Sequence, residues 1–247
     1  MRTAPAPSAR RVRTGTIALG LAGVLCGACG GGALPSAAHT VHHANTVRGP
    51  RGTLTAATVS VTSGFTRVEV ATNDLGAALY SAHTPADSGT VPATQQHGGT
   101  VEIGQRSVSG HRGSDQVLEV ELARGVRWTI NLDGGASTES VDMHQGRLTA
   151  LRFGAGVSDA TVSLPAPDGT QMVTVAGGAS RLTITAGPGS PAQIRVDGGA
   201  ASLSVDGAVH TGVAGGTVYT EPGWTAAANR YLIELTAGVS DAQLTRT

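Results

Sequence analysis

Ala-Gly-Val-Ser-Asp-Ala stands at residues 155–160 and again at residues 237–242, within a longer pattern of small residues that decides the fold. That pattern occurs five times, as Asp133-Gly134-Gly135-Ala136-Ser137, Gly154-Ala155-Gly156-Val157-Ser158, Ala176-Gly177-Gly178-Ala179-Ser180, Asp197-Gly198-Gly199-Ala200-Ala201 and Thr236-Ala237-Gly238-Val239-Ser240. The second glycines at 135, 156, 178 and 199 are separated by 21, 22 and 21 residues, and the next, at 238, follows after 39. We interpret 39 residues as two repeats with a degenerate copy near Gly215-Gly216. Such self-similarity is typical of a repeat architecture.

Short alternating stretches flank the repeated segments, for example Val173-Thr174-Val175, Leu182-Thr183-Ile184 and Ile194-Arg195-Val196. Alternation of β-branched and polar residues predicts strands that are buried on one face, and the glycines predict the corners between them. Aromatic residues make up only 3% of the chain, which favours a thin aliphatic core. The predicted fold is all-β, a single-stranded, β-helix-like solenoid with coils of about 21 residues.

The strand signal begins before the clear repeats and is less regular there. We expect a solenoid domain over residues 54–247, with irregular first coils over 54–122 and regular repeats over 123–247. A separate small β domain is the alternative for the first part. The stretch from His83 to His97 contains proline and glutamine and is predicted to be a surface loop.

The N-terminus has the pattern of an export signal. Four arginines and no acid precede residue 14, and an apolar run from Thr16 to Cys29 follows. Leu25-Cys26-Gly27-Ala28-Cys29 resembles the lipobox of bacterial lipoproteins, although Cys26 stands where that family prefers leucine. The resemblance implies a lipoprotein signal over residues 1–29, lipidation at Cys29 and an extracytoplasmic, lipid-anchored protein. Cleavage near Ser36-Ala37-Ala38, which would give a secreted protein, and an uncleaved anchor are the alternatives.

Residues 30–53 are rich in glycine, alanine, serine, threonine and histidine and predict a flexible linker. His39, His42 and His43 are the residues in it that bind metals in other contexts, but no carboxylate or cysteine accompanies them, so we predict no metal site. Cys26 and Cys29 also form a C-x-x-C pair. Their place inside the apolar signal argues against redox chemistry.

Composition excludes several functions. The chain has no lysine, which rules out Schiff-base chemistry and the lysine-containing phosphate loop. Removing the four arginines of the signal from 17 basic residues leaves 13 against 17 acidic residues, so nucleic-acid binding is not expected. We find no catalytic or cofactor motif and predict no enzyme and no cofactor.

Carboxylate pairs are the strongest argument for an enzyme. On a solenoid with coils in sequence order, Asp133 and Asp197 would be three coils apart, and Asp159 and Asp241 four, too far for glycoside hydrolysis. Ser158, Asp159 and His144 form an imaginable nucleophile set, but Ser240-Asp241 repeats the pair with no histidine nearby. These residues are more simply explained as turn residues of the repeat.

Tyr219, Trp224 and Tyr231 are close together near the degenerate copy of the repeat. Exposed aromatic rings there would form a surface for a sugar or protein partner. The other interpretation is that they cap the end of the solenoid core.

The recurring Gly-Gly-Ala-Ser and Ala-Gly-Val-Ser units, Arg124-Gly125-Val126 and Leu164-Pro165 resemble a bacterial family of adhesin-like domains of unknown function. Similar domains occur at the C-terminus of LiaF-type cell-envelope stress proteins. The resemblance implies a non-catalytic envelope scaffold or adhesin-like binding module, with an envelope protein or cell-wall glycan as partner. A polysaccharide-binding or polysaccharide-cleaving solenoid is the alternative.

Overall fold

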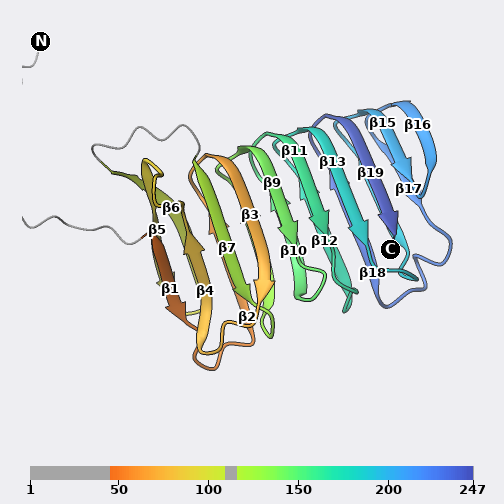
Figure 1. Ribbon diagram of the computed structural model, residues 1–247. Helices are drawn as coiled ribbons and strands as arrows, with labels where there is room; N and C mark the ends of the chain where they lie inside the picture. Colours follow the sequence, from red (N-terminus) through yellow and green to blue (C-terminus); the bar gives the residue numbers. More distant parts are fainter. Residues whose placement is uncertain (1–44, 109–115, 247) are drawn as a thin grey trace, which may run out of the picture. The chain divides into compact units, whose positions relative to one another are not determined.

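The computed structural model describes residues 45–108 and 116–246, and it confirms the all-β prediction: no helix is present in this part of the chain (Figure 1). The strands form two facing sheets. In spatial order, sheet 1 contains β1 (Thr46–Pro50), β4 (Ala78–His83), β7 (Val117–Ala123), β3 (Phe65–Asn73), β9 (Ala136–Asp142), β11 (Val157–Ser163), β13 (Ala179–Ala186), β19 (Val239–Arg246), β15 (Ala200–Val205) and β16 (Ala208–Val213). Sheet 2 contains β17 (Thr217–Thr220), β14 (Ala192–Val196), β18 (Arg230–Leu235), β12 (Thr170–Val175), β10 (Arg147–Phe153), β8 (Arg127–Leu132), β2 (Ala56–Val61), β6 (Thr100–Ser107) and β5 (Thr90–His97).

Alternate residues of each central strand enter the core between the two sheets. Trp128, Ile130 and Leu132 of β8 are buried, as are Leu182 and Ile184 of β13. The indole of Trp128 donates to the carbonyl oxygen of Ala123 at 3.1 Å, so its one polar atom is satisfied. Burial of every second side chain is the period that the sequence predicted.

The repeated corners are of two kinds, Gly-Gly and Ala-Gly, which alternate along the stack. A Cβ at Gly177 would overlap the backbone of Ala155 in the neighbouring corner, and a Cβ at Gly198 would overlap the backbone of Ala237. The Gly-Gly corners also contain a glycine with positive φ, +83° at Gly178, which the Ala-Gly corners do not need. Each alanine-bearing corner is therefore packed against corners in which only glycine fits.

The strands do not follow one another in sequence order, which corrects the simple solenoid that we predicted. From β8 to β13 the coils are consecutive: β8, β10 and β12 are parallel neighbours in sheet 2, and β9, β11 and β13 in sheet 1. Beyond them, β19 lies between β13 and β15, and β18 lies between β12 and β14. This order puts the Ala237 corner between the Gly177 and Gly198 corners. Within the 39-residue interval, the corner at Gly215 does lie against Asp197, but the strands on either side of it, β16 and β17, run antiparallel to their neighbours. The chain then returns into the stack as β18 and β19.

The end of the stack formed by β1 and β5 is closed. Both β1 and β4 of sheet 1 lie against β5 of sheet 2, and the side chain of Gln96 in β5 donates to the carbonyl oxygen of Pro50 in β1 at 3.0 Å. The predicted loop from His83 to His97 is wrong in its second half, because residues from Thr90 on form β5. Likewise, β1 lies inside the predicted linker, so ordered structure begins before residue 54.

At the opposite end, two antiparallel strands finish the sheets: β16 pairs with β15, and β17 pairs with β14. The signal segment, Cys29 and the histidines at 39, 42 and 43 lie outside the described residues. Within the described residues, no helix has the length and apolar character needed to span a membrane.

Candidate functional site

A row of polar side chains crosses the outer face of sheet 1. Five outward positions on neighbouring strands are aligned in register, and we call them the hydroxyl row: Ser140, Thr161, Thr183, Gln243 and Ser204. Neighbouring members are one strand apart, about 4.8 Å. The result is a flat strip of short hydroxyl and amide groups.

A shallow groove of about 260 Å³ lies over β13, β19 and β15 beside this row. Its polar lining consists of Arg181, Thr183, Ser202, Ser204, Asp241 and Gln243. Hydroxyl, amide, carboxylate and guanidinium groups together offer both donors and acceptors to a hydroxyl-rich ligand.

The acids at this groove are closer together than the sequence suggested. Arg181 pairs in register with Asp159 on one side and Asp241 on the other, and it forms an ion pair with Asp159. The two carboxylates are therefore two strands apart, roughly 9.6 Å, rather than the four coils that we predicted. The predicted separation was too large because β19 lies directly next to β13 in the sheet.

The other sequence-predicted sets are not brought together. Asp133, which forms an ion pair with Arg152, follows β8, and Asp197 follows β14, four strands away in sheet 2. Ser158 lies at the start of β11, whereas His144 lies just beyond the far end of β9 and binds Asp142 at 2.6 Å. In the described part of the chain, no group of three or more histidine, cysteine, aspartate or glutamate side chains is arranged to hold a metal ion.

Of the three aromatic residues predicted near the C-terminal end, Tyr231 is fully buried, which corrects its assignment to a partner surface. Its hydroxyl donates to the carbonyl oxygen of Pro165 at 2.9 Å and accepts from the amide of Gly187 at 3.2 Å. Burial raises the pKa of this phenol. Tyr231 is therefore a core residue of β18, which lies between β12 and β14 and not at the end of the stack.

Trp224 and Tyr219 are partly exposed. The indole of Trp224 donates to the carbonyl oxygen of Tyr231 at 2.8 Å, and the guanidinium of Arg230 lies over its ring, 4.4 Å from the centroid. The Tyr219 ring packs against His210, with 4.6 Å between centroids. The three aromatic residues do not form one platform, because each contacts a different part of this end.

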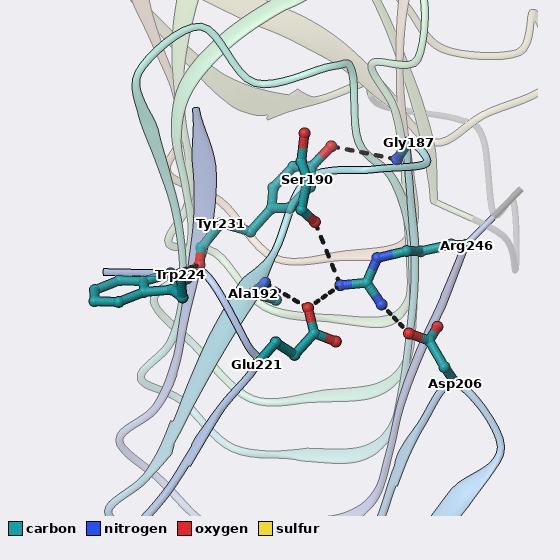
Figure 2. Close-up of polar contacts among 8 residues, drawn as sticks. All are labelled: Gly187, Ser190, Ala192, Asp206, Glu221, Trp224, Tyr231 and Arg246. Atoms are coloured by element: carbon teal, nitrogen blue, oxygen red, sulfur yellow. Dashed lines mark hydrogen bonds and ion pairs between the residues drawn. The ribbon is translucent and has the colours of Figure 1, made fainter. Parts of the chain in front are cut away.

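Arg246 at the end of β19 joins two carboxylates that the sequence analysis did not single out (Figure 2). Its guanidinium pairs with Asp206 and Glu221 and donates to the carbonyl oxygen of Ser190 at 3.4 Å. Glu221 also accepts from the backbone amide of Ala192 at 2.7 Å. The cluster ties β19 to the loops beside β14 and β15.

A cavity of about 240 Å³ opens at this same end, between the two sheets. Its walls are mostly apolar, with Ala192 and Ile194 from β14 and Val205 from β15, and its rim contains His210 and Tyr219. The core is therefore less completely covered here than at the β1–β5 end.

Glu139 in β9 is the one buried carboxylate of the described residues, with 1% of its surface exposed. Its neighbours in register are Val68 and Ala160, and its Oε2 atom has no hydrogen-bond partner. Burial raises the pKa of Glu139 to about 8. Its position two residues before the buried Val141 is the signal in the sequence that could have revealed it.

Residues 40–185, more than half of the chain, match the family described as the N-terminal domain of toast_rack, DUF2154. No curated protein is significantly similar to the chain. Among solved structures it resembles a candidate cell adhesion protein from Clostridium sporogenes ATCC 15579, with a TM-score of 0.58, 12% identity, and coverage of 82% of this chain and 98% of the other. At that identity the likeness shows a shared fold alone. The chain belongs to the family described as the N-terminal domain of toast_rack, DUF2154.

Proposed function

We propose that this protein is a non-catalytic, adhesin-like binding module of the cell envelope, and that the groove beside the hydroxyl row is its ligand-binding surface. The observation that carries the proposal is the alignment of Thr183, Gln243 and Ser204 on three neighbouring strands, next to Arg181 and Asp241. A flat polar strip on rigid strands suits repeated hydrogen bonding to an extended, hydroxyl-rich partner such as a wall glycan. The similarity to a candidate cell adhesion protein supports a binding role.

The experiment is sedimentation of the full-length protein with isolated bacterial cell walls. Thr183→Lys places a long charged side chain in the groove and is expected to reduce binding at least tenfold. Thr174→Lys is the matched control, because Thr174, like Thr183, is an outward, half-buried threonine, but it lies in β12 of sheet 2. Equal binding by the two variants would overturn the assignment of the groove.

Export and lipid anchoring are part of the proposal. The apolar run before Cys29 and the lipobox-like segment support attachment of a lipid at that residue. Metabolic labelling with a fatty acid is expected to label the wild-type chain but not a Cys29→Ala variant. Release of an unlabelled wild-type protein into the medium would contradict anchoring and favour secretion. The similarity to LiaF-type proteins, and with it a role in envelope stress, belongs to the same proposal.

A second candidate function is cleavage of a polysaccharide. It is favoured by one observation: Asp159 and Asp241 face the groove side of sheet 1 with Arg181 between them. Their separation of roughly 9.6 Å is at the upper limit for an inverting pair. Asp159 forms an ion pair with Arg181, however, so this carboxylate already has a partner within the protein. Release of reducing ends from wall glycans, abolished by Asp241→Asn, would favour cleavage over simple binding.

A further inference from the structure

The cavity between the two sheets at the β16–β17 end combines apolar walls with a carboxylate. Ile194 and Val205 contribute aliphatic side chains, and the rings of His210 and Tyr219, which come from opposite sheets, pack against each other beside them. Glu221 also lines the cavity. An apolar cavity of about 150 Å³ admits a benzene-sized ligand. This cavity of about 240 Å³ therefore has room for a short aliphatic chain.

The carboxylate of Glu221 is only partly used within the protein. Its contacts with the guanidinium of Arg246 and the backbone amide of Ala192 are both made by one oxygen, Oε2 (Figure 2). The other oxygen, Oε1, accepts no hydrogen bond from the described residues. Arg246 is shared with Asp206, so two carboxylates face one guanidinium and the cluster has a net charge of −1.

This combination favours a ligand with one positive charge on an aliphatic stem. A cation neutralises the excess charge of the cluster, and the partly buried site strengthens the attraction relative to water. A guanidinium matches two carboxylate oxygens in a fork, whereas an ammonium group is a compact charge that needs one acceptor. Because Arg246 already occupies Oε2 of Glu221, the single remaining oxygen suits an ammonium group better. The Tyr219 ring in the lining adds a further attraction for a cation.

The ligand must come from a different molecule. The chain contains no lysine, so neither its own side chains nor those of a second copy supply an ammonium group on such a stem. We propose that the cavity binds the side chain of a lysine presented by a peptide partner, with the aliphatic stem between the sheets and the ammonium group donating to Oε1 of Glu221. This site is separate from the groove beside the hydroxyl row, which lies on the outer face of sheet 1.

An NMR titration of the isotope-labelled full chain with Nα-acetyl-lysine amide tests this, with Cys26 and Cys29 changed to serine to exclude lipid and disulfides. We expect saturable shifts of the amide signals of Ala192 and Tyr219, with a dissociation constant on the order of 1 mM for a ligand of this size. Nα-acetyl-norleucine amide has an aliphatic stem without the charge and should bind roughly fivefold more weakly or worse. Nα-acetyl-arginine amide should also bind more weakly than the lysine derivative, because one oxygen does not match its fork.

Glu221→Gln keeps an acceptor for the amide of Ala192 but removes the negative charge. It is expected to weaken binding of the lysine derivative roughly fivefold or more. Glu234→Gln is the matched control: Glu234 also forms an ion pair with an arginine, Arg195, but it lies on the outward side of β18. Its replacement should leave the dissociation constant unchanged.

The absence of saturable shifts up to about 50 mM of the lysine derivative would overturn the proposal. So would equal affinity for the norleucine derivative, tighter binding of the arginine derivative, or unchanged binding by Glu221→Gln. Thermal unfolding shows whether each variant is folded, and the comparison of the three derivatives needs no variant at Glu221. Sedimentation with cell walls and this titration probe different surfaces, so failure of one leaves the other intact.

Discussion

Replacing Glu139 by glutamine is expected to stabilise the protein at neutral and alkaline pH. The carboxyl group is buried in the core side of sheet 1, between Val68 and Ala160, with one oxygen unpartnered. Burial disfavours its charged form, which raises the pKa from 4.5 to about 8. In the unfolded chain the same group loses its proton near the lower value.

The sign of the effect follows from proton linkage. Between pH 4.5 and 8 the folded state holds a proton that the unfolded state has released, so the free energy of unfolding falls as pH rises. At 1.36 kcal/mol for each pKa unit, the loss is about 3 kcal/mol at pH 7 and roughly 5 kcal/mol above pH 8. Below pH 4.5 the group is protonated in both the folded and the unfolded chain, so it does not lower the free energy of unfolding in this way.

Urea unfolding followed by circular dichroism, at intervals from pH 4 to pH 9, measures this directly. The free energy of unfolding of the wild type should fall over that window, whereas that of Glu139→Gln should change little with pH. At pH 7 the variant should be more stable than the wild type by about 3 kcal/mol. Glu119→Gln is the control, since Glu119 faces solvent on the neighbouring region of the same sheet. Parallel pH profiles for the wild type and Glu139→Gln would refute the reasoning.

Two further predictions concern the packing of the stack and are tested by thermal and urea unfolding. Gly177→Ala should cost about 1–3 kcal/mol because its Cβ would overlap the backbone of the adjacent corner, whereas Gly187→Ala, whose nearest neighbour would be 3.5 Å away, should change stability by less than about 0.5 kcal/mol; equal effects would contradict the close approach. Arg246→Met should cost about 1–3 kcal/mol because it leaves two carboxylates without their cation. Arg195→Met removes the half-exposed ion pair with Glu234 at 3.6 Å and should cost less than about 1 kcal/mol. A larger loss of stability in Arg195→Met than in Arg246→Met would contradict the expectation that the Arg246 cluster matters more.

The sequence predicts the local structure of the repeats well because each strand and corner is decided by residues near one another. The alternation of buried and outward residues in β12, and in β13 from Arg181 on, is readable without a structure, as are the glycine corners. Strand order is different, since any parallel strand with the same pattern can occupy any position in the stack.

A signal for the strand order is nevertheless present in the corners. Placed in sequence order, the Gly177 and Gly198 corners would be neighbours, and two glycine corners would meet with no alanine between them. The structure places the Ala237 corner between them and restores the alternation. The burial of Tyr231 and the partial exposure of Tyr219 depend on the strand order, because β18 lies inside sheet 2 whereas β17 is its edge.

The inserted position of β18 and β19 has a consequence for how the protein acquires its structure. These strands follow β14–β17 in the chain, yet they lie between earlier strands in both sheets. A nascent chain that has reached only residue 229 therefore has a gap in the middle of its stack, and β14 and β15 have no parallel neighbour to join. Beyond β13, folding cannot proceed coil by coil as the chain emerges: the strands from β14 on must wait until residues 230–246 arrive and then close as one cooperative unit.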